Sequence, residues 1–448
     1  MVQKMSCVSP SQTDSVHHSA SVDALGLCSL NATGLEAAHQ SAERVGGSLF
    51  RNQVLRYLGK ISQQCSSQWL VRDGASVWHF GQPALEQMPL QITVRHPRFY
   101  RRLALGGSLG AAQSYIDGDW DVTDLCRLFI DLARHLDVTS HLEGFATIAR
   151  PWRTTVNWFR RNNRLGSRRN ISAHYDLSNE FFAQMLDPSM TYSSGIFSNE
   201  HTSLADAQFE KYDRICRKLR IGPEDHVLEI GTGWGGFALH AARKYGCRVT
   251  TTTISAQQYQ YANSRIREAG LEGQISLISQ DYRDLIGQYD KLVSIEMIEA
   301  VGHQYLDRYF AKCSQLLKPQ GVMCLQAITL PDHRFQSYLR SVDFIQRYIF
   351  PGGCLPSLGA IAGAVSRVTD LRWLHCEDFG THYATTLNHW RKNFWERIDQ
   401  VRALGFDRQF IRTWEYYLCY CLAGFAERQI GVAQLVLARP QARLEPIL

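Results

Sequence analysis

The chain has 448 residues, of which 45% are hydrophobic and 20% are charged, and its formal net charge is +6. A single hydrophobic core stops growing at roughly 250 to 300 residues, so this length predicts more than one domain. The small positive excess argues against a nucleic-acid binder and is compatible with an anionic surface as partner. The twelve cysteines show neither C-x-x-C pairs nor Cys/His ligand spacing, which predicts reduced thiols, no metal site and a cytoplasmic location.

The first part of the chain predicts a disordered leader followed by a small domain. Residues 1–45 are rich in Ser, His and Ala without apolar periodicity, and they lack the apolar core of a secretory signal. From 46 to 149, segments such as "LQITVRHPRFYRRLAL" and "GGSLGAAQSYIDGDWDV" alternate strand and helix patterns around glycine turns, which favours an α+β domain.

The longest uncharged apolar run of the chain, "YYLCYCLAGFA", is about half of the roughly 20 residues that a membrane-spanning helix needs, so we expect no membrane-spanning helix.

A basic connector is predicted over residues 150–172. The stretch from Arg150 to Asn170 carries seven arginines, two tryptophans and no acidic residue. Such a run is often a solvated linker, but basic side chains near an anionic leaflet contribute about 1 kcal/mol each, and Trp favours the membrane interface. Both interpretations stay open at this point.

Residues 173–448 predict a larger α/β domain. The apolar run "HVLEI" is followed by a glycine loop and by "GFALHAARKYG", which has helical spacing and a glycine stop. The β-rich runs "CRVTTTTI", "ISLISQDY" and "YDKLVSIEMI" come next, separated by helical stretches. This alternation predicts a Rossmann-like parallel sheet with helices on both faces and ligands at the carboxyl ends of the strands.

The glycine loop "LEIGTGWGG" fits two kinds of cofactor. Gly231, Gly233 and Gly236 match the spacing of a dinucleotide site, whereas Gly231, Gly233 and Gly235 match the looser loop of a methyltransferase. A dinucleotide loop needs an acidic residue about 20 positions later for the ribose, and "VTTTTISAQQ" has none there. The loop also opens on Glu229, an arrangement frequent among enzymes that use S-adenosylmethionine.

Several longer blocks carry a resemblance to one family. The segments "AHYDLSNEFFAQMLDPSMTYSSGIF", "QDYRD", "SIEMIEAVGHQYLDRYF" and "QRYIFPGGCLPS", with the glycine loop and the "GGSLGAAQSYIDGDWDV" block, occur in order over roughly residues 90–438. Together they resemble the cyclopropane-fatty-acyl-phospholipid synthases. The resemblance implies transfer of a methyl group from S-adenosylmethionine to a cis double bond of a phospholipid acyl chain, followed by proton loss and ring closure.

The resemblance also implies which residues contact the cofactor. They lie in the "MTYSS" segment, the glycine loop, the strand end "TISAQQ" and the "QDYRD" segment. By position they are Tyr192, Ser193, Glu229, Gly231, Gly233, Gly235, Gly236, Thr253, Ile254, Ser255, Gln258, Tyr282 and Arg283. Without the resemblance, the polar residues after the second strand would be explained as a helix cap.

In the resembled family a bound bicarbonate is the base that removes the proton. A Glu, a Tyr and a backbone amide hold it, and they match Glu299, Tyr383 and Ile328. Two positions depart from the pattern, because Ser194 stands where many members have Cys and Gln326 where many have His. Both can still hydrogen-bond an oxyanion, but neither supplies a positive charge. Glu296, three residues before Glu299, is the nearest rival carboxylate.

A cysteine often assigned to the active site of the resembled family matches Cys354. Methyl transfer to an alkene needs no thiolate, so the chemistry favours a pocket-lining role for this cysteine.

The resemblance implies an unsaturated membrane phospholipid as partner, peripheral association with the anionic inner face of the membrane, and a homodimer. A same-fold enzyme that forms a methyl-branched chain is the main alternative function. A nicotinamide oxidoreductase and a non-catalytic lipid-binding protein are less favoured alternatives.

Overall fold

The computed structural model describes residues 49–63, 67–82, 88–134 and 177–445. These residues belong to one compact unit, Leu49–Leu448. The predicted leader, the predicted connector 150–172 with its arginines, and the predicted domain boundaries next to it lie outside the described residues. The domain limits therefore stay a prediction.

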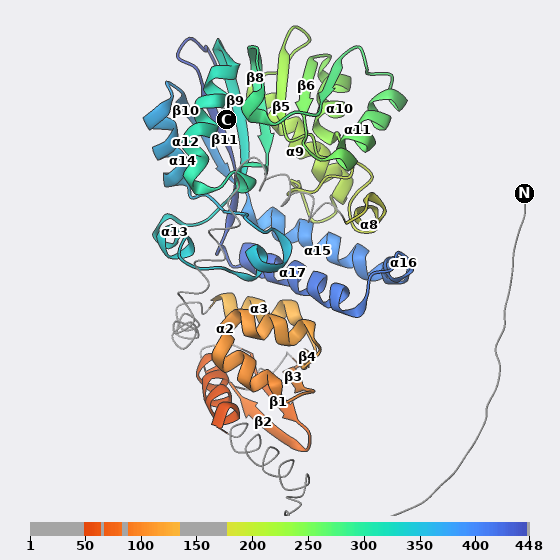
Figure 1. Ribbon diagram of the computed structural model, residues 1–448, viewed down its shortest axis with the longest axis vertical. Helices are drawn as coiled ribbons and strands as arrows, with labels where there is room; N and C mark the ends of the chain where they lie inside the picture. The colour runs from red at the N-terminus through yellow and green to blue at the C-terminus, as the bar shows by residue number, and fades with distance from the viewer. Residues whose placement is uncertain (1–48, 64–66, 83–87, 135–176, 446–448) are drawn as a thin grey trace, which may run out of the picture. The chain divides into compact units, whose positions relative to one another are not determined.

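The N-terminal part is a small α+β arrangement (Figure 1). Its sheet has the order β2-β1-β3-β4, in which β1 and β3 are parallel and the other neighbours antiparallel. The strands are β1 (Trp69–Asp73), β2 (Ser76–Phe80), β3 (Leu90–Val94) and β4 (Trp120–Val122). The helices cover residues 49–62, α2 (Arg98–Ile116) and α3 (Leu125–Arg134). Alternate residues of β3 are buried, because successive strand residues point to opposite faces.

The C-terminal part contains a seven-stranded sheet of order β10-β11-β9-β8-β5-β6-β7. Strands β5 to β9 run parallel, and β11 is antiparallel to both of its neighbours. The bounds are β5 (His226–Ile230), β6 (Arg248–Thr252), β7 (Ile275–Ile278), β8 (Tyr289–Ile295), β9 (Leu317–Thr329), β10 (Arg372–Asp378) and β11 (Gly431–Ala438). The predicted α/β class with a smaller N-terminal part is confirmed.

Helices cover both faces of the large sheet, as expected for a doubly wound fold (Figure 1). One face packs against α9 (Leu204–Leu219), α10 (Gly236–Tyr245) and α11 (Ala256–Glu268), and the other against α12 (Leu306–Leu316) and α14 (Leu358–Val368). Neighbouring strand residues divide between the faces: Val227 packs with the first set, and Leu228 with the second.

The remaining helices gather at the carboxyl ends of the parallel strands. They are α8 (Asn179–Ala183), α13 (Asp332–Tyr338), α15 (Gly380–Glu396), α16 (Ile398–Ala403) and α17 (Arg408–Ala426), with short turns η3 (Tyr282–Asp284), η4 (Ile298–Ala300), η5 (His303–Tyr305) and η6 (Ile345–Ile349). The apolar run "YYLCYCLAGFA" lies in α17, where it is largely buried against other protein groups. Among the described residues, no helix combines the length and apolar character needed to span a bilayer.

Arg412 on α17 ties the C-terminal part to the N-terminal part. Its guanidinium donates to the carbonyls of Tyr115 and Trp120, at 2.5 and 2.8 Å, and pairs with Asp121 at 2.8 Å. It also lies 3.9 Å from the centre of the Tyr115 ring. The side chain is 13% exposed, so these contacts are made largely away from water.

We predict that Arg412→Ala destabilises the protein by about 2 to 4 kcal/mol, because it removes two hydrogen bonds to backbone carbonyls, the ion pair with Asp121 and the packing of the guanidinium on the Tyr115 ring. Chemical denaturation measures the change. The control is Arg402→Ala, which removes an exposed pair with Asp399 and should cost no more than about 0.5 kcal/mol. Equal losses in the two variants would contradict the prediction.

Candidate active site

The site forms where the strand order of the large sheet reverses. β5 is hydrogen-bonded to β6 on one side and to β8 on the other, so the loops after β5 and β8 diverge at their carboxyl ends. Ligands of doubly wound sheets bind at this point. The loop after β5 is the glycine loop, and the loop after β8 begins at Glu296.

The glycine loop has a backbone conformation that requires glycine. Gly231, Gly233 and Gly235 have φ angles of 101°, 53° and 88°, a region that other residues enter at a cost of about 1 to 2 kcal/mol. The amides of Gly231 and Thr232 donate to the carbonyl of Thr252 on β6, at 3.1 and 3.0 Å. A Cβ at Gly236 would lie 2.4 Å from the Tyr212 hydroxyl oxygen. The loop therefore places backbone without side chains, at Gly231, Gly233 and Gly236, against the cavity at the carboxyl ends of the strands.

Glu229 lies behind the loop rather than in solvent. It is 2% exposed, and the Thr251 hydroxyl donates to its carboxylate at 2.6 Å. Burial raises the pKa of Glu229 to about 8, and the Thr251 hydrogen bond and Lys211 oppose the rise. Glu229 lines the same cavity as the glycine loop, and its carboxyl group can accept hydrogen bonds from the amino group of an amino-acid moiety, so the residues fit S-adenosylmethionine.

The polar residues after β6 form a helix cap. The Ser255 hydroxyl caps α11 by accepting from the Gln258 amide at 3.3 Å, and the Thr253 hydroxyl donates to the Gln258 side chain at 3.0 Å. Thr253, Ile254 and Gln258 line the cavity described below, whereas Ser255 does not. The capping explanation therefore holds for Ser255 and is compatible with cofactor contact for the other three.

Tyr282 and Arg283 lie in the 3-10 turn after β7. Arg283 pairs with Asp281 at 2.6 Å, with both side chains more than 90% buried, and Tyr282 packs edge-on against Tyr309. Both residues line the cavity. The Asp281–Arg283 pair holds the turn rigidly at the carboxyl edge of the sheet.

Tyr192 and Ser193 reach the same cavity from the segment before α9. The Tyr192 hydroxyl hydrogen-bonds the Tyr417 hydroxyl at 2.8 Å, and its ring stacks on Trp390 with a centroid distance of 5.1 Å. Lys211 on α9, fully buried, donates to the Ser193 hydroxyl at 2.6 Å. Burial lowers the pKa of Lys211 to about 7, while Glu296, Asp187 and Glu229 favour its charged form.

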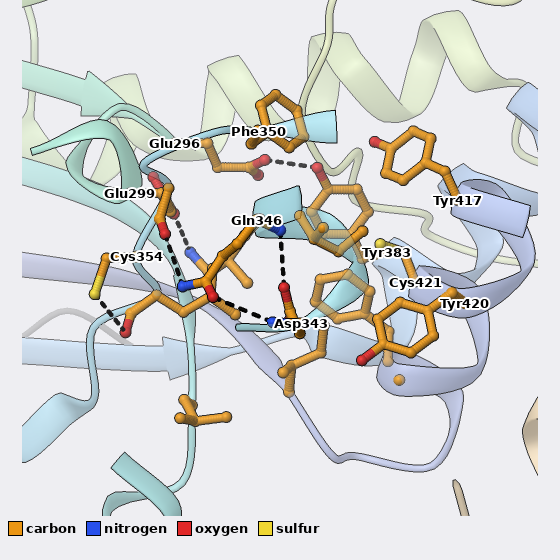
Figure 2. Close-up of a pocket in the computed structure, with 18 of the residues that line it drawn as sticks. Glu296, Glu299, Asp343, Gln346, Phe350, Cys354, Tyr383, Tyr417, Tyr420 and Cys421 are labelled. Carbon is orange, nitrogen blue, oxygen red and sulfur yellow. Dashed lines mark hydrogen bonds between the residues drawn. The ribbon is translucent and has the colours of Figure 1, made fainter. Parts of the chain in front are cut away.

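Glu296 is held by three donors. The Tyr383 hydroxyl donates to Oε2 at 2.7 Å, and the Gln326 amide and the Ser194 backbone N–H donate to Oε1 at 2.8 and 3.0 Å. Figure 2 shows the contact between Glu296 and Tyr383, with Glu299 beside it. Burial raises the pKa of Glu296, and the three donors and Lys211 oppose that rise.

Glu299 has fewer hydrogen-bond donors around its carboxylate than Glu296. The Ile328 backbone N–H donates to Oε1 at 2.5 Å, while the buried Oε2 has no hydrogen-bond partner among the described residues. Burial, with the repulsion of Glu296 added to it, raises the pKa of Glu299 to about 8. Of the two carboxylates, Glu296 therefore has the surroundings that better stabilise a negative charge.

The residues predicted to hold bicarbonate divide between these two carboxylates. Tyr383, Gln326 and the Ser194 amide bind Glu296, and Ile328 binds Glu299. The Ser194 hydroxyl donates to the Gly195 carbonyl instead. The donors thus already hold carboxylates of the chain itself, and the residues present do not fit a bound bicarbonate.

Cys354 lines the cavity next to the carboxylate pair. Its amide donates to the Glu299 carbonyl at 2.8 Å, and burial raises the pKa of its thiol to about 11. A protonated thiol is a weak nucleophile, which favours the pocket-lining role for this cysteine.

One cavity of about 1160 Å³ connects the glycine loop with both carboxylates. It continues along α17 and into the N-terminal part, where apolar side chains such as Leu103 and Phe129 line it. Most of the predicted residues border it: Tyr192, Ser193, Glu229, Gly231, Gly233, Gly236, Thr253, Ile254, Gln258, Tyr282, Arg283, Glu299, Ile328, Cys354 and Tyr383. Gly235, Ser255, Ser194 and Gln326 lie behind the wall rather than in it.

Sequence reasoning gave no role to three residues of this site. The three residues are Lys211 on α9, Trp390 on α15 and Tyr417 on α17. The sequence pattern of these helices indicates only which face is buried, and it does not indicate which residue each side chain contacts. Their contacts join segments far apart in the chain, as for the Tyr192–Tyr417 hydrogen bond. For Glu296, its position directly after a buried strand was the one signal in the sequence.

Solved structures share this fold. A cyclopropane synthase from Mycobacterium tuberculosis, MmaA2, aligns with a TM-score of 0.57 and 28% identity, covering 60% of this chain and 98% of that one. The mycolic acid cyclopropane synthase CmaA1, solved with S-adenosylhomocysteine, gives the same TM-score at 30% identity, covering 60% of this chain and 98% of that one. The fold and the site define a class I methyltransferase whose cofactor is S-adenosylmethionine.

Sequence comparisons give the family. The model of the mycolic acid cyclopropane synthetase family matches residues 162–435, so the chain belongs to that family. It is 40% identical over 348 residues to the tuberculostearic acid methyltransferase UfaA1 of M. tuberculosis, covering 76% of this chain and 81% of that one. It is 35% identical over 354 residues to the cyclopropane-fatty-acyl-phospholipid synthase of Escherichia coli K12, covering 78% of this chain and 88% of that one.

We predict that Gly231→Ala lowers the affinity for S-adenosylmethionine at least about tenfold, because the strained φ distorts the loop and the new Cβ lies 3.4 Å from Met297. Titration calorimetry measures the affinity. The matched control is Gly270→Ala, which also has a positive φ but open space around it. Gly270→Ala should lose similar stability without losing affinity, and unchanged affinity in Gly231→Ala would exclude the loop from cofactor binding.

Proposed function

We propose that this methyltransferase acts on the cis double bond of an unsaturated acyl chain carried by a membrane phospholipid, and that the product is a cyclopropane ring. The observation that carries the proposal is the shared cavity. It joins the glycine loop, which suits the cofactor, to an apolar channel and to a buried carboxylate pair. Ligand cavities typically measure about 300–1000 Å³, so this volume leaves room for a chain beside the cofactor.

The chain's own residues meet the demands of the reaction. An alkene is a weak nucleophile, so it must be held against the methyl group in a site without water. Tyr192 and Tyr417 line the cavity, and Trp390 stacks behind Tyr192, so an acyl chain would displace water from an aromatic surface there. Aromatic faces also stabilise the positive charge that develops on the acyl chain.

A methyl-branched product is the second candidate. Two observations favour it: the 40% identity with a tuberculostearic acid methyltransferase, and the departures Ser194 and Gln326 from the pattern of the cyclopropane-forming enzymes. Both products begin with the same methyl transfer, so they differ only in the later fate of the cationic chain.

Incubation of the purified protein with labelled S-adenosylmethionine and vesicles of a monounsaturated phospholipid should incorporate label into the acyl chains. Proton NMR of the extracted chains then separates the products, because cyclopropane methylene protons resonate upfield of every other acyl proton. Labelled chains without these signals would show that the product is the methyl-branched chain and not the cyclopropane ring. Absence of label in the lipid, with intact cofactor binding, would overturn the proposed function.

The membrane is the proposed partner, because a phospholipid chain does not leave the bilayer unaided. The basic connector 150–172 lies outside the described residues and is proposed to contact the anionic inner face of the membrane. The positive charge and tryptophans of that segment support the proposal. The homodimer also stays a prediction.

Replacing Arg160, Arg161 and Arg164 by Gln should weaken binding to phosphatidylglycerol vesicles roughly a hundredfold at low salt, since each basic residue contributes about 1 kcal/mol. Co-sedimentation measures the binding, and the difference should shrink as salt rises. The control is the same change at the exposed residues Arg243, Arg248 and Arg267. Equal effects of the two triple variants would identify the connector as a plain linker.

A further inference from the structure

The donors of the active site converge on a side chain of the protein. Tyr383 on α15, Gln326 on β9 and the amide of Ser194 come from three distant segments, and all three donate to the Glu296 carboxylate. Three hydrogen bonds match the accepting capacity of an ionised carboxylate far better than that of a neutral one. The pocket is therefore built around a fixed anion at this position.

The backbone at Glu296 is held in an unfavourable conformation. Its φ of 47° lies in the left-handed region that favours glycine. Its amide donates to the Gln326 carbonyl at 2.8 Å, so the same residue contacts both the backbone and the side chain of Glu296. A strained residue persists where its surroundings fix it, and such residues cluster at functional sites.

Glu296 also lies beside the cofactor loop. The next residue, Met297, is the neighbour that a Cβ at Gly231 would touch, and Glu296 lines the cavity together with Gly231 and Tyr192. The carboxylate thus borders the space in which a methyl group and an acyl chain would meet.

The neighbouring groups favour a negative charge on Glu296 over one on Glu299. Lys211, fully buried, favours an ionised Glu296, whereas Glu299 has one backbone donor and a buried oxygen without a partner among the described residues. Of the two carboxylates, Glu296 is therefore the one whose hydrogen bonds better stabilise the ionised form, which is the form that accepts a proton.

We propose that the Glu296 carboxylate is the proton acceptor of the reaction and takes the position that a bound bicarbonate would occupy. The inference rests on the proposed function. Bound S-adenosylmethionine supplies an electrophilic methyl group, whose transfer to the double bond leaves a cationic carbon in the chain. Glu296 then removes a proton from the added methyl group, and the C–H electron pair forms the second C–C bond of the ring. The proton leaves Glu296 for solvent before the next turnover.

The first test is Glu296→Gln, which keeps the shape of the side chain but cannot accept the proton. The rate of methyl transfer should fall about 10²–10⁴-fold, the usual contribution of a general base. The dissociation constant for S-adenosylmethionine should change less than about threefold. The control is Glu210→Gln on α9, which removes another carboxylate whose partners, Arg214 and Arg217, lie outside the site, and it should keep the wild-type rate.

The second test is Glu296→Gly, which opens a space lined by the same donors and relieves the positive φ. Formate or bicarbonate should restore the rate of this variant at least about tenfold. Titration calorimetry should detect formate binding to Glu296→Gly and none to the wild type. The control for the backbone change is Arg220→Gly, which removes a positive φ of 50° at the end of α9, and it should bind no formate.

The third test is bicarbonate dependence of the wild type. Its rate should stay constant when dissolved carbon dioxide is stripped from the assay. A rate that falls more than about tenfold and returns on addition of bicarbonate would overturn the proposal, and so would a near wild-type rate of Glu296→Gln.

Failure of the proposed function gives a different pattern. A wild type that methylates no lipid would overturn that function, whereas formate binding requires no turnover. Formate binding to Glu296→Gly, without binding to the wild type, would still support the Glu296 carboxylate as the anion of the site. Equal formate binding to the wild type would overturn that assignment.

Discussion

The burial of two carboxylates at the end of β8 is the constraint on which the rest of the site depends. An ionised carboxylate away from water is costly unless donors surround it. This requirement explains why a tyrosine of α15, a glutamine of β9 and an amide next to Ser193 converge on Glu296. Glu299, whose carboxylate accepts from the Ile328 amide, lacks a comparable set of donors, and its pKa is raised to about 8. Two like residues three positions apart are thereby stabilised as anions to different degrees.

The helices that supply those donors also build the wall of the cavity. Tyr383 stacks on Phe425 of α17 with a centroid distance of 4.3 Å, and Trp390 of α15 packs against Tyr192. The same aromatic layer therefore positions a donor and contributes Tyr192 and Tyr383 to the wall of the cavity. Arg412 anchors α17 to the N-terminal part, which links the integrity of the channel to residues remote from the chemistry.

Much of the large sheet was predictable because its signals are local. The strand "HVLEI" is β5, the helix after the glycine loop ends at Gly246 as its glycine stop predicts, and the later strands occur in the expected order. The glycine loop was predictable for the same reason, since positive φ angles at Gly231 and Gly233 require that residue type. The bonding partners of Ser194 and Gln326 were not, because each depends on a segment about 30 or 100 residues away.

The sequence by itself determined the fold class, the cofactor loop and the family, since periodicity, glycine spacing and ordered motifs are properties of short segments. It also put two candidate carboxylates at the end of one strand. Only the tertiary structure decided between them, because the charge of a carboxylate depends on the donors, cations and burial around it. Those surroundings come from β9, α9 and α15, which meet only when the chain is folded.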